Sequence, residues 1–173
     1  MTISLTGLMG CGKSSVGREL SKLLSWHYMD LDEVIVQREG RSIPEIFAED
    51  GEKAFRRMEL EAFKAVTGAA EDGGTVLALG GGTITIPECA EIAHEKTLCI
   101  YMRASVQTLK DRLEGQTEGR PLLSGQDIGE RLARLMSERG HIYEETAHII
   151  VDTDGKTISE IAEEILRSSH HAR

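Results

Sequence analysis

Short apolar runs alternate along the chain with longer segments in which apolar residues recur at helical spacing. The short runs, each followed by a polar or glycine-rich turn, predict five strands, at residues 3–6, 26–29, 75–79, 98–102 and 148–151. The helical spacing predicts helices at residues 14–24, 43–66, 106–113, 128–139 and 158–166. Strands that alternate with helices in this way are typical of a parallel sheet covered by helices. The pattern therefore predicts a single α/β domain over residues 1–173, whose ligands bind at the carboxyl ends of the strands.

Local signals refine this pattern. Ser42, followed by Pro44 and Glu45, has the pattern of a capped helix start. Residues 114–126 form a polar, glycine-bearing stretch, which predicts a mobile lid loop above the ligand-binding edge. Residues 168–173 are expected to form a frayed, solvated tail.

Composition and charge narrow the classes of function. The chain is 40% apolar and 28% charged, and no uninterrupted apolar run approaches a membrane-spanning length. Its 20 basic and 29 acidic residues give a net charge of −9, which argues against a broad surface for nucleic acid or for anionic membranes. The three cysteines show no metal-ligand spacing, and the first residues lack the basic stretch of a secretory signal. We therefore expect a cytoplasmic protein with reduced thiols.

The chemistry begins with the sequence GLMGCGKS at residues 7–14, which fits GxxxxGK[ST] between a predicted strand and a predicted helix. In such a loop the backbone N–H groups and the positive end of the helix face phosphate oxygens. Lys13 then reaches the β- and γ-phosphates of ATP, and Ser14 ligates Mg²⁺. The loop predicts a three-layer P-loop NTPase fold that uses ATP and Mg²⁺, with ATP contacts from Gly10, Cys11, Gly12, Lys13, Ser14 and Ser15. GTPases, motor ATPases and small-molecule kinases all carry such a loop, although no Asn-Lys-x-Asp motif for guanine is present.

Acidic side chains follow the second predicted strand. Asp30 and Asp32 are two residues apart, so in an extended chain both carboxylates would project from one face into the crevice. Asp30 is then expected to contact Mg²⁺, directly or through water, and Asp32 to contact a substrate hydroxyl. The alternative is that both acids cap a helix, because Asp is common where a strand gives way to a helix.

Five motifs stand in one order along nearly the whole chain: residues 7–14, Asp-Leu-Asp at 30–32, Phe-Arg-Arg-Met-Glu at 55–59, Gly-Gly-Gly at 80–82 and Arg-Pro-Leu-Leu at 120–123. Together they resemble the shikimate kinase family. The resemblance implies transfer of the γ-phosphoryl group of ATP to the 3-hydroxyl of shikimate, giving shikimate 3-phosphate and ADP. It also implies the acceptor contacts: Arg56 and Arg139 to the shikimate carboxylate, and Asp32 with the glycines Gly80, Gly81 and Gly82 to its hydroxyls.

The residue chemistry agrees with this reading, because a guanidinium offers a planar fork that pairs with both oxygens of a carboxylate. Taken alone, Arg56 on a helix rich in Glu would be interpreted as a surface arginine, and its neighbour Arg57 is left as one. Glycines at a strand end allow the backbone, here the N–H of Gly81, to approach a hydroxyl closely.

The resemblance also assigns the lid. Arg120 matches an arginine that closes over the nucleotide and touches the transferred phosphoryl group, so Lys13, Asp32 and Arg120 are the predicted catalytic residues. Arg112 is the candidate for stacking on adenine, and the loop ending at Asp154 is expected to contact the edge of the base.

The sequence leaves two other functions open. Another small-molecule kinase, of the gluconate or nucleoside-monophosphate type, would share the phosphate loop but not the acceptor pocket. A catalytically idle ATP-binding module would not need Asp32 or Arg120. The favoured interpretation is a monomeric enzyme whose partners are ATP and shikimate.

Overall fold

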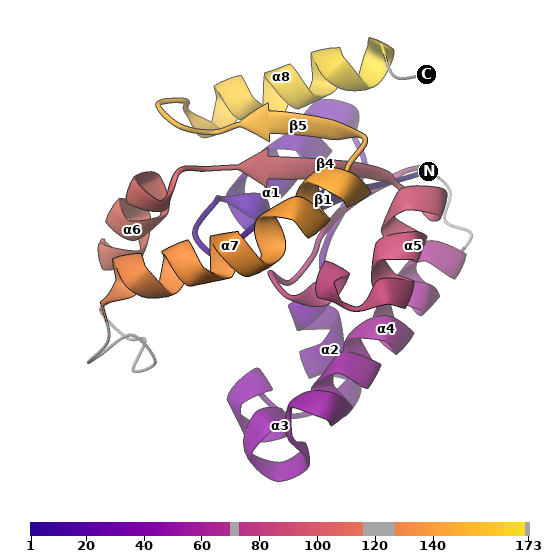
Figure 1. Cartoon of the computed structure of the whole chain (residues 1–173). Helices are drawn as coiled ribbons and strands as arrows, with labels where there is room; N and C mark the ends of the chain where they lie inside the picture. The colour runs from indigo at the N-terminus through magenta and orange to yellow at the C-terminus, as the bar shows by residue number, and fades with distance from the viewer. Residues whose placement is uncertain (70–72, 116–126, 172–173) are drawn as a thin grey trace.

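The computed structural model describes residues 1–69, 73–115 and 127–171, and in this part of the chain a parallel sheet forms the centre of the molecule (Figure 1). All five predicted strands are present: β1 Thr2–Thr6, β2 His27–Asp30, β3 Thr75–Ala78, β4 Leu98–Arg103 and β5 Ile149–Asp152. They pair in the order β2-β3-β1-β4-β5, and every pair is parallel. Their carboxyl ends therefore lie along one edge of the sheet, where the loops that follow β1, β2, β3 and β5 come together.

Helices cover both faces of this sheet. The helices are α1 Lys13–Leu24, α2 Leu31–Glu39, α3 Ile43–Asp50, α4 Glu52–Gly68, α5 Pro87–Lys96, α6 Val106–Glu114, α7 Ile128–Thr146 and α8 Ile158–His171, with a 3₁₀ turn, η1, at Thr83–Thr85. In Figure 1, α1 and α8 pack together on one face, whereas α5 and α7 pack on the other face against β4. Helices α2 and α3 each contact α4, and the three form a lobe beside the sheet. The prediction of a three-layer α/β fold is confirmed.

The helix boundaries differ from the prediction in several places. The segment predicted as one helix at 43–66 is two helices, because Gly51 has φ 83° and ψ 171° and ends α3 as it begins α4. The predicted capped start of α3 is confirmed: Ser42 Oγ accepts the N–H of Glu45, and Glu45 Oε2 accepts the N–H of Ser42. Helix α7 continues beyond its predicted end at residue 139, because Gly140 lies inside the helix and Tyr143 is still part of its buried face.

Two helices were not predicted. Helix α2 buries only Leu31 and Ile35, which is too short an apolar stripe to detect, and α5 is similarly weak in large apolar residues. The expectation of a frayed tail from residue 168 is wrong as far as residue 171, because α8 continues through it and Ser169 is buried with its hydroxyl on the carbonyl of Leu166. Residues 172–173 lie outside the described part, as do residues 116–126 of the predicted lid. No helix among the described residues is long and apolar enough to span a membrane.

A pair of histidines lies where α5, α7 and the sheet meet. His148, just before β5, accepts the backbone N–H of Cys99 on its Nδ1 at 3.0 Å. Its ring stacks on that of His94 from α5, with centroids 4.6 Å apart, and His94 Nδ1 lies 3.1 Å from the carbonyl oxygen of Thr146. Partial desolvation of its ring, together with the charge of His94, lowers the pKa of His148, although much of the residue is exposed. The folded state therefore favours the neutral His148 ring.

This arrangement predicts a loss of stability in acid. The folded pKa of His148 is below its usual value of about 6.5, so the unfolded state binds more protons between the two values. The contribution of His148 to the free energy of unfolding is therefore complete above pH 6.5 and is lost as the pH falls through the folded pKa. Urea unfolding at pH 7.5 and pH 5 should show a smaller acid-induced loss in a His148→Asn variant than in the wild type. The matched control is His141→Asn, at an exposed position of α7. An equal acid-induced loss in the wild type and in His148→Asn would contradict this account.

Candidate functional site

The glycine-rich loop between β1 and α1 has a backbone that only glycine adopts readily. Gly7 has φ 144°, and a Cβ there would lie 2.7 Å from the carbonyl oxygen of Met102. Gly12 has φ 94° and directly precedes α1. The chain therefore enters the helix through a left-handed residue, a conformation that favours glycine. Lys13 Nζ donates to the carbonyls of Gly7 at 2.7 Å and Leu8 at 3.2 Å. The loop and the amino terminus of α1 thus place several N–H groups and one ammonium in a small volume, which is the chemistry of a phosphate site.

A cavity of about 680 Å³ opens beside this loop, within the size range of small-molecule sites. The six ATP contacts predicted in the loop line this cavity, as does the predicted adenine contact Arg112 of α6. Val16 and the start of α8 complete the lining, which consists of Gly10, Cys11, Gly12, Lys13, Ser14, Ser15, Val16, Arg112, Lys156, Thr157, Ile158 and Ile161. The structure therefore brings the loop residues and Arg112 to the same cavity. Cys11 is 1% exposed, so its thiol belongs to the packed side of the loop.

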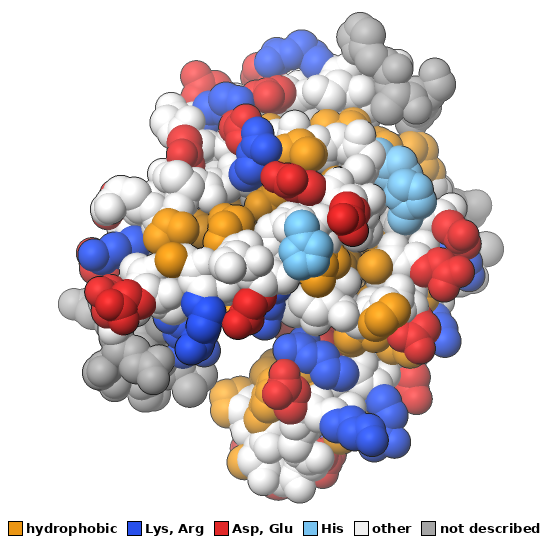
Figure 2. All heavy atoms as spheres, viewed as in Figure 1, with side chains coloured by type: hydrophobic (Ala, Val, Ile, Leu, Met, Phe, Trp, Pro, Cys, Tyr) orange, Lys and Arg blue, Asp and Glu red, His pale blue; other side chains and the backbone are white. Residues whose placement is uncertain are grey.

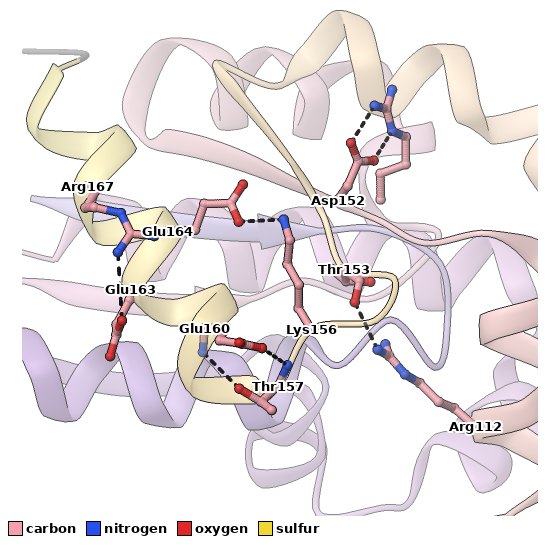
Figure 3. A network of polar contacts seen from close by, with 10 residues as sticks. Arg112, Asp152, Thr153, Lys156, Thr157, Glu160, Glu163, Glu164 and Arg167 are labelled. Atoms are coloured by element: carbon pink, nitrogen blue, oxygen red, sulfur yellow. Dashed lines mark hydrogen bonds and ion pairs between the residues drawn. The ribbon is translucent and has the colours of Figure 1, made fainter.

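Arg112 connects the two sides of the cavity. Its Nη1 donates to the carbonyls of Cys11 at 3.1 Å and Gly10 at 3.4 Å, and its Nη2 donates to the carbonyl of Thr153 at 3.5 Å (Figure 3). Asp154 does not line the cavity, and its Oδ1 instead accepts the N–H of Ser105 at 3.0 Å.

The start of α8 was missed as part of the cavity. Thr157 and Glu160 form a capping box, in which Thr157 Oγ1 accepts the N–H of Glu160 and Glu160 Oε2 accepts the N–H of Thr157 (Figure 3). Next to it, Lys156 Nζ pairs with Glu164 at 2.6 Å. The Thr-x-x-Glu pattern in the sequence marks this helix start, and it was the only local signal available for this part of the cavity.

Asp30 joins the loop to the next element. Its Oδ2 accepts the hydroxyl of Ser14 at 3.2 Å, while its Oδ1 accepts the N–H groups of Asp32 at 2.9 Å and Glu33 at 3.4 Å. Asp30 therefore caps α2 and also faces Ser14. The expectation that Asp32 continues an extended strand is wrong, because Asp32 lies in the first turn of α2. A hydroxyl beside a carboxylate is a hard oxygen pair that fits Mg²⁺, which takes only one or two protein ligands beside phosphates and water.

The glycines after β3 allow three polar side chains to converge. A Cβ on Gly80 would lie 3.0 Å from Thr83 Oγ1, 3.1 Å from Glu59 Oε1 and 3.4 Å from Asp32 Oδ1. A Cβ on Gly82 would lie 2.6–2.9 Å from the guanidinium of Arg56. Any side chain at residue 82 would therefore displace Arg56.

Arg56 is held by a buried carboxylate. Its Nη1 donates to Glu59 Oε2 at 2.5 Å, and Glu59 Oε1 accepts the hydroxyl of Thr83 at 2.8 Å. The side chain of Glu59 is 1% exposed and that of Arg56 is 25% exposed, whereas Arg57 is exposed as predicted. Sequence reasoning gave no role to Glu59 or Thr83, although Glu59 stands three residues after Arg56, the spacing at which helical side chains meet.

Asp32 lies among charges of both signs. Burial contributes most, followed by the charges of Asp30 and Glu59, and together they raise the pKa of Asp32 to about 6 against the opposing effect of Lys13 and Arg56. A carboxylate with a pKa near the working pH is suited to accept a proton.

Gly81 brings the two halves of the site into contact. A Cβ on Gly81 would lie 3.6 Å from the carbonyl oxygen of Gly7, 3.7 Å from the N–H nitrogen of Met9 and 3.8 Å from Arg139 Nη1. The hydroxyl of Tyr143, which the sequence did not single out, donates to the carbonyl of Gly81 at 2.5 Å. Figure 2 shows the surface hollowed between the body of the molecule and the lobe that contains α3. The predicted finger Arg120 lies outside the described residues.

Comparisons with known proteins agree on one family. A family model described as "Shikimate kinase" matches residues 9–170. The chain is 43% identical to a shikimate kinase of Thermus thermophilus over 164 residues, which cover 95% of this chain and 87% of the relative. It is 40% identical to a shikimate kinase of Geobacter sulfurreducens over 163 residues, 94% of this chain and 87% of the relative.

Solved structures give the same result. The shikimate kinase of Acinetobacter baumannii in complex with shikimate superposes with a TM-score of 0.90 at 31% identity, covering 99% of this chain and 94% of the other. The enzyme of Aquifex aeolicus superposes with a TM-score of 0.83 at 32% identity, covering 98% and 96%.

The raised pKa of Asp32 predicts that its charge destabilises the fold. Because the folded pKa of about 6 exceeds the usual 3.8, the ionised carboxylate at pH 7 carries a cost that is absent below pH 4. Asp32→Asn should therefore raise the free energy of unfolding at pH 7 by about 3 kcal/mol, at about 1.4 kcal/mol per pKa unit, and by much less at pH 4.

Urea unfolding at both pH values measures this difference. The matched control is Glu33→Gln, at an exposed acid in the same helical turn, which should change the stability little. A variant Asp32→Asn that is less stable than the wild type at pH 7 would show that Asp32 is a structural acid.

Proposed function

The chain belongs to the shikimate kinase family and is an ATP-dependent kinase that acts on shikimate, and we propose that the transfer takes place where Gly81 meets the phosphate loop. The observation that carries this proposal is the position of Gly81, beside Gly7 and Met9 on one side and Arg139 on the other. A phosphate held by residues 7–14 and an acceptor held by residues 80–82 would be neighbours there. Proximity of this kind supplies much of the rate in phosphoryl transfer.

In this proposal the nucleotide binds in the cavity beside α1. The backbone N–H groups of the loop and the amino terminus of α1 bind the phosphates, and Lys13 neutralises their charge. Arg112 and the start of α8 stand where the base would lie. Ser14 and Asp30 would hold Mg²⁺, which, when bound, neutralises charge on the phosphate oxygens.

The acceptor side is polar and carries both signs of charge. Arg56 and Arg139 bind the shikimate carboxylate, and the backbone of residues 80–82 with Asp32 binds its hydroxyls. Glu59 keeps the guanidinium of Arg56 in place through the hydrogen bond at Nη1.

The reaction needs one proton transfer. The 3-hydroxyl oxygen of shikimate attacks the γ-phosphorus of ATP, the bond to the β–γ bridging oxygen breaks, and ADP leaves as shikimate 3-phosphate forms. Asp32 orients the hydroxyl and accepts its proton late, because the transition state is loose and carries its charge on the phosphate oxygens. Arg120 is proposed to stabilise that charge from the lid.

The proposal has three further parts, which are Mg²⁺ as the metal, a monomeric state and a cytoplasmic location. The three cysteines are free and buried, which is consistent with a reducing compartment.

The first test is release of ADP. With ATP and Mg²⁺, shikimate should stimulate ADP release, gluconate should not, and chelation of the metal should abolish the activity. Since Asp32 must be ionised to accept the proton, kcat/KM should rise with pH through about 6 and level off above it. Stimulation by gluconate instead of shikimate would overturn the assignment of the acceptor.

The second test separates binding from chemistry. Arg56→Lys keeps a positive charge beside the buried Glu59 but removes the planar fork, so it should raise the KM for shikimate on the order of tenfold to a hundredfold with little change in kcat. Arg57→Lys, at the exposed neighbouring arginine, is the matched control and should change neither constant. Arg120→Ala should mainly lower kcat. Equal effects of Arg56→Lys and Arg120→Ala on both constants would contradict this division of roles.

A further inference from the structure

The three carbonyl groups of residues 80–82 are each fixed by a hydrogen bond, but the partners differ in kind. Gly80 O accepts the N–H of Thr83 at 3.1 Å, and Gly82 O accepts the N–H of Thr85 at 3.1 Å and its hydroxyl at 2.6 Å. Both of these partners are local, within η1. The partner of Gly81 O is the hydroxyl of Tyr143, 62 residues later in the chain.

Tyr143 is placed to act as a fixed donor. Its side chain is fully buried on α7, and its ring stacks on that of Tyr101 with centroids 5.0 Å apart and an interplanar angle of 29°. Burial raises the pKa of Tyr143 to about 12, although the nearby charge of Arg139 acts in the opposite direction. The hydroxyl therefore keeps its proton at any pH at which the enzyme works.

The hydrogen bond fixes a peptide group that sterics leave free. Glycine has no Cβ to restrict its dihedral angles, so a peptide between two glycines rotates more readily than any other. A trans peptide is planar, so a fixed Gly81 carbonyl also fixes the Gly82 N–H, which points the opposite way. Gly82 in turn lies against the guanidinium of Arg56.

The same residue connects this peptide to Arg139. Arg139 precedes Tyr143 by four residues on α7, a spacing that places two side chains on one face of a helix. The Arg139 guanidinium lies 3.8 Å from the point where a Cβ of Gly81 would stand. Tyr143 thus connects α7, which carries one proposed carboxylate ligand, to the glycines beside the other.

From this geometry we infer that Tyr143 is a positioning residue for shikimate, which holds the Gly81–Gly82 peptide and Arg139 in one arrangement so that a single acceptor contacts both. The inference rests on the proposed assignment of residues 80–82, Arg56 and Arg139 to the acceptor. Tyr143 itself acts through Gly81 and does not contact the reacting atoms.

Tyr143→Phe tests the inference, because it removes one hydroxyl and keeps the ring stack. The matched control is Tyr101→Phe, which removes the hydroxyl of the stacked partner, a group that contacts only the sulfur of Met136 at 3.6 Å among the hydrogen bonds of the described residues. Steady-state kinetics with each substrate varied, and the rise in Tm caused by shikimate alone, are the measurements.

Tyr143→Phe should raise the KM for shikimate on the order of tenfold, leave the KM for ATP within about twofold, and reduce the rise in Tm that shikimate causes. Tyr101→Phe should leave both KM values unchanged. Equal KM values for shikimate in the two variants, or a proportionate rise in both KM values of Tyr143→Phe, would overturn the inference.

Arg56→Lys, measured in parallel, separates this failure from a failure of the proposed site. If Arg56→Lys raises the KM for shikimate and Tyr143→Phe does not, only the role of Tyr143 is wrong. If Arg56→Lys also leaves that KM unchanged, the acceptor site itself is misplaced, and the inference falls with it.

Discussion

The acceptor side of the site depends on one buried charge. Among the described residues, Glu59 is the only Asp, Glu, Lys or Arg that is buried, and both of its oxygens have partners, Arg56 and the hydroxyl of Thr83. A buried carboxylate without a partner costs several kcal/mol, so the fold holds Arg56 against Glu59 whether or not a ligand is present. Because Thr83 belongs to the turn after β3, the same charge connects α4 to the glycines. The geometry that would bind a carboxylate substrate is therefore set by the need to neutralise an internal one.

The buried charge of Glu59 carries a cost at Asp32, on the neighbouring helix α2. Burial first, and then repulsion by Asp30 and Glu59, raises the pKa of Asp32, so the folded chain disfavours its ionised carboxylate. Lys13 and Arg56 offset part of this repulsion. A site that is less stable than its surroundings is common where chemistry is required, because the group that must accept a proton cannot also be fully satisfied in the resting fold.

The sequence predicted the sheet and the phosphate loop because both rest on local patterns. Each strand is a short apolar run, and the loop needs glycines whose positions in the sequence are themselves the signal. The conformation of Asp32 was wrongly predicted, because Asp30 ends its strand by capping the next helix, and a two-residue spacing then no longer means one face. Tyr143 received no role because its partner Gly81 is 62 residues away, which no local pattern reveals. The three-residue spacing of Arg56 and Glu59 is a local signal for their contact, but it does not reveal the second partner of Glu59, Thr83, 24 residues away.

Gly81 explains why a glycine is needed even where there is room for a side chain. A Cβ at this position would lie 3.6–3.8 Å from Gly7, Met9 and Arg139, which is ordinary van der Waals contact and not a clash. A side chain there would, however, stand between the phosphate loop and α7, the space in which we propose that the acceptor meets the nucleotide. A glycine leaves that space open, but its backbone rotates more freely than that of any other residue. A hydrogen bond from outside the three glycines is then needed to hold the Gly81 carbonyl in one orientation. A buried tyrosine on the helix that also carries Arg139 supplies it without filling the space.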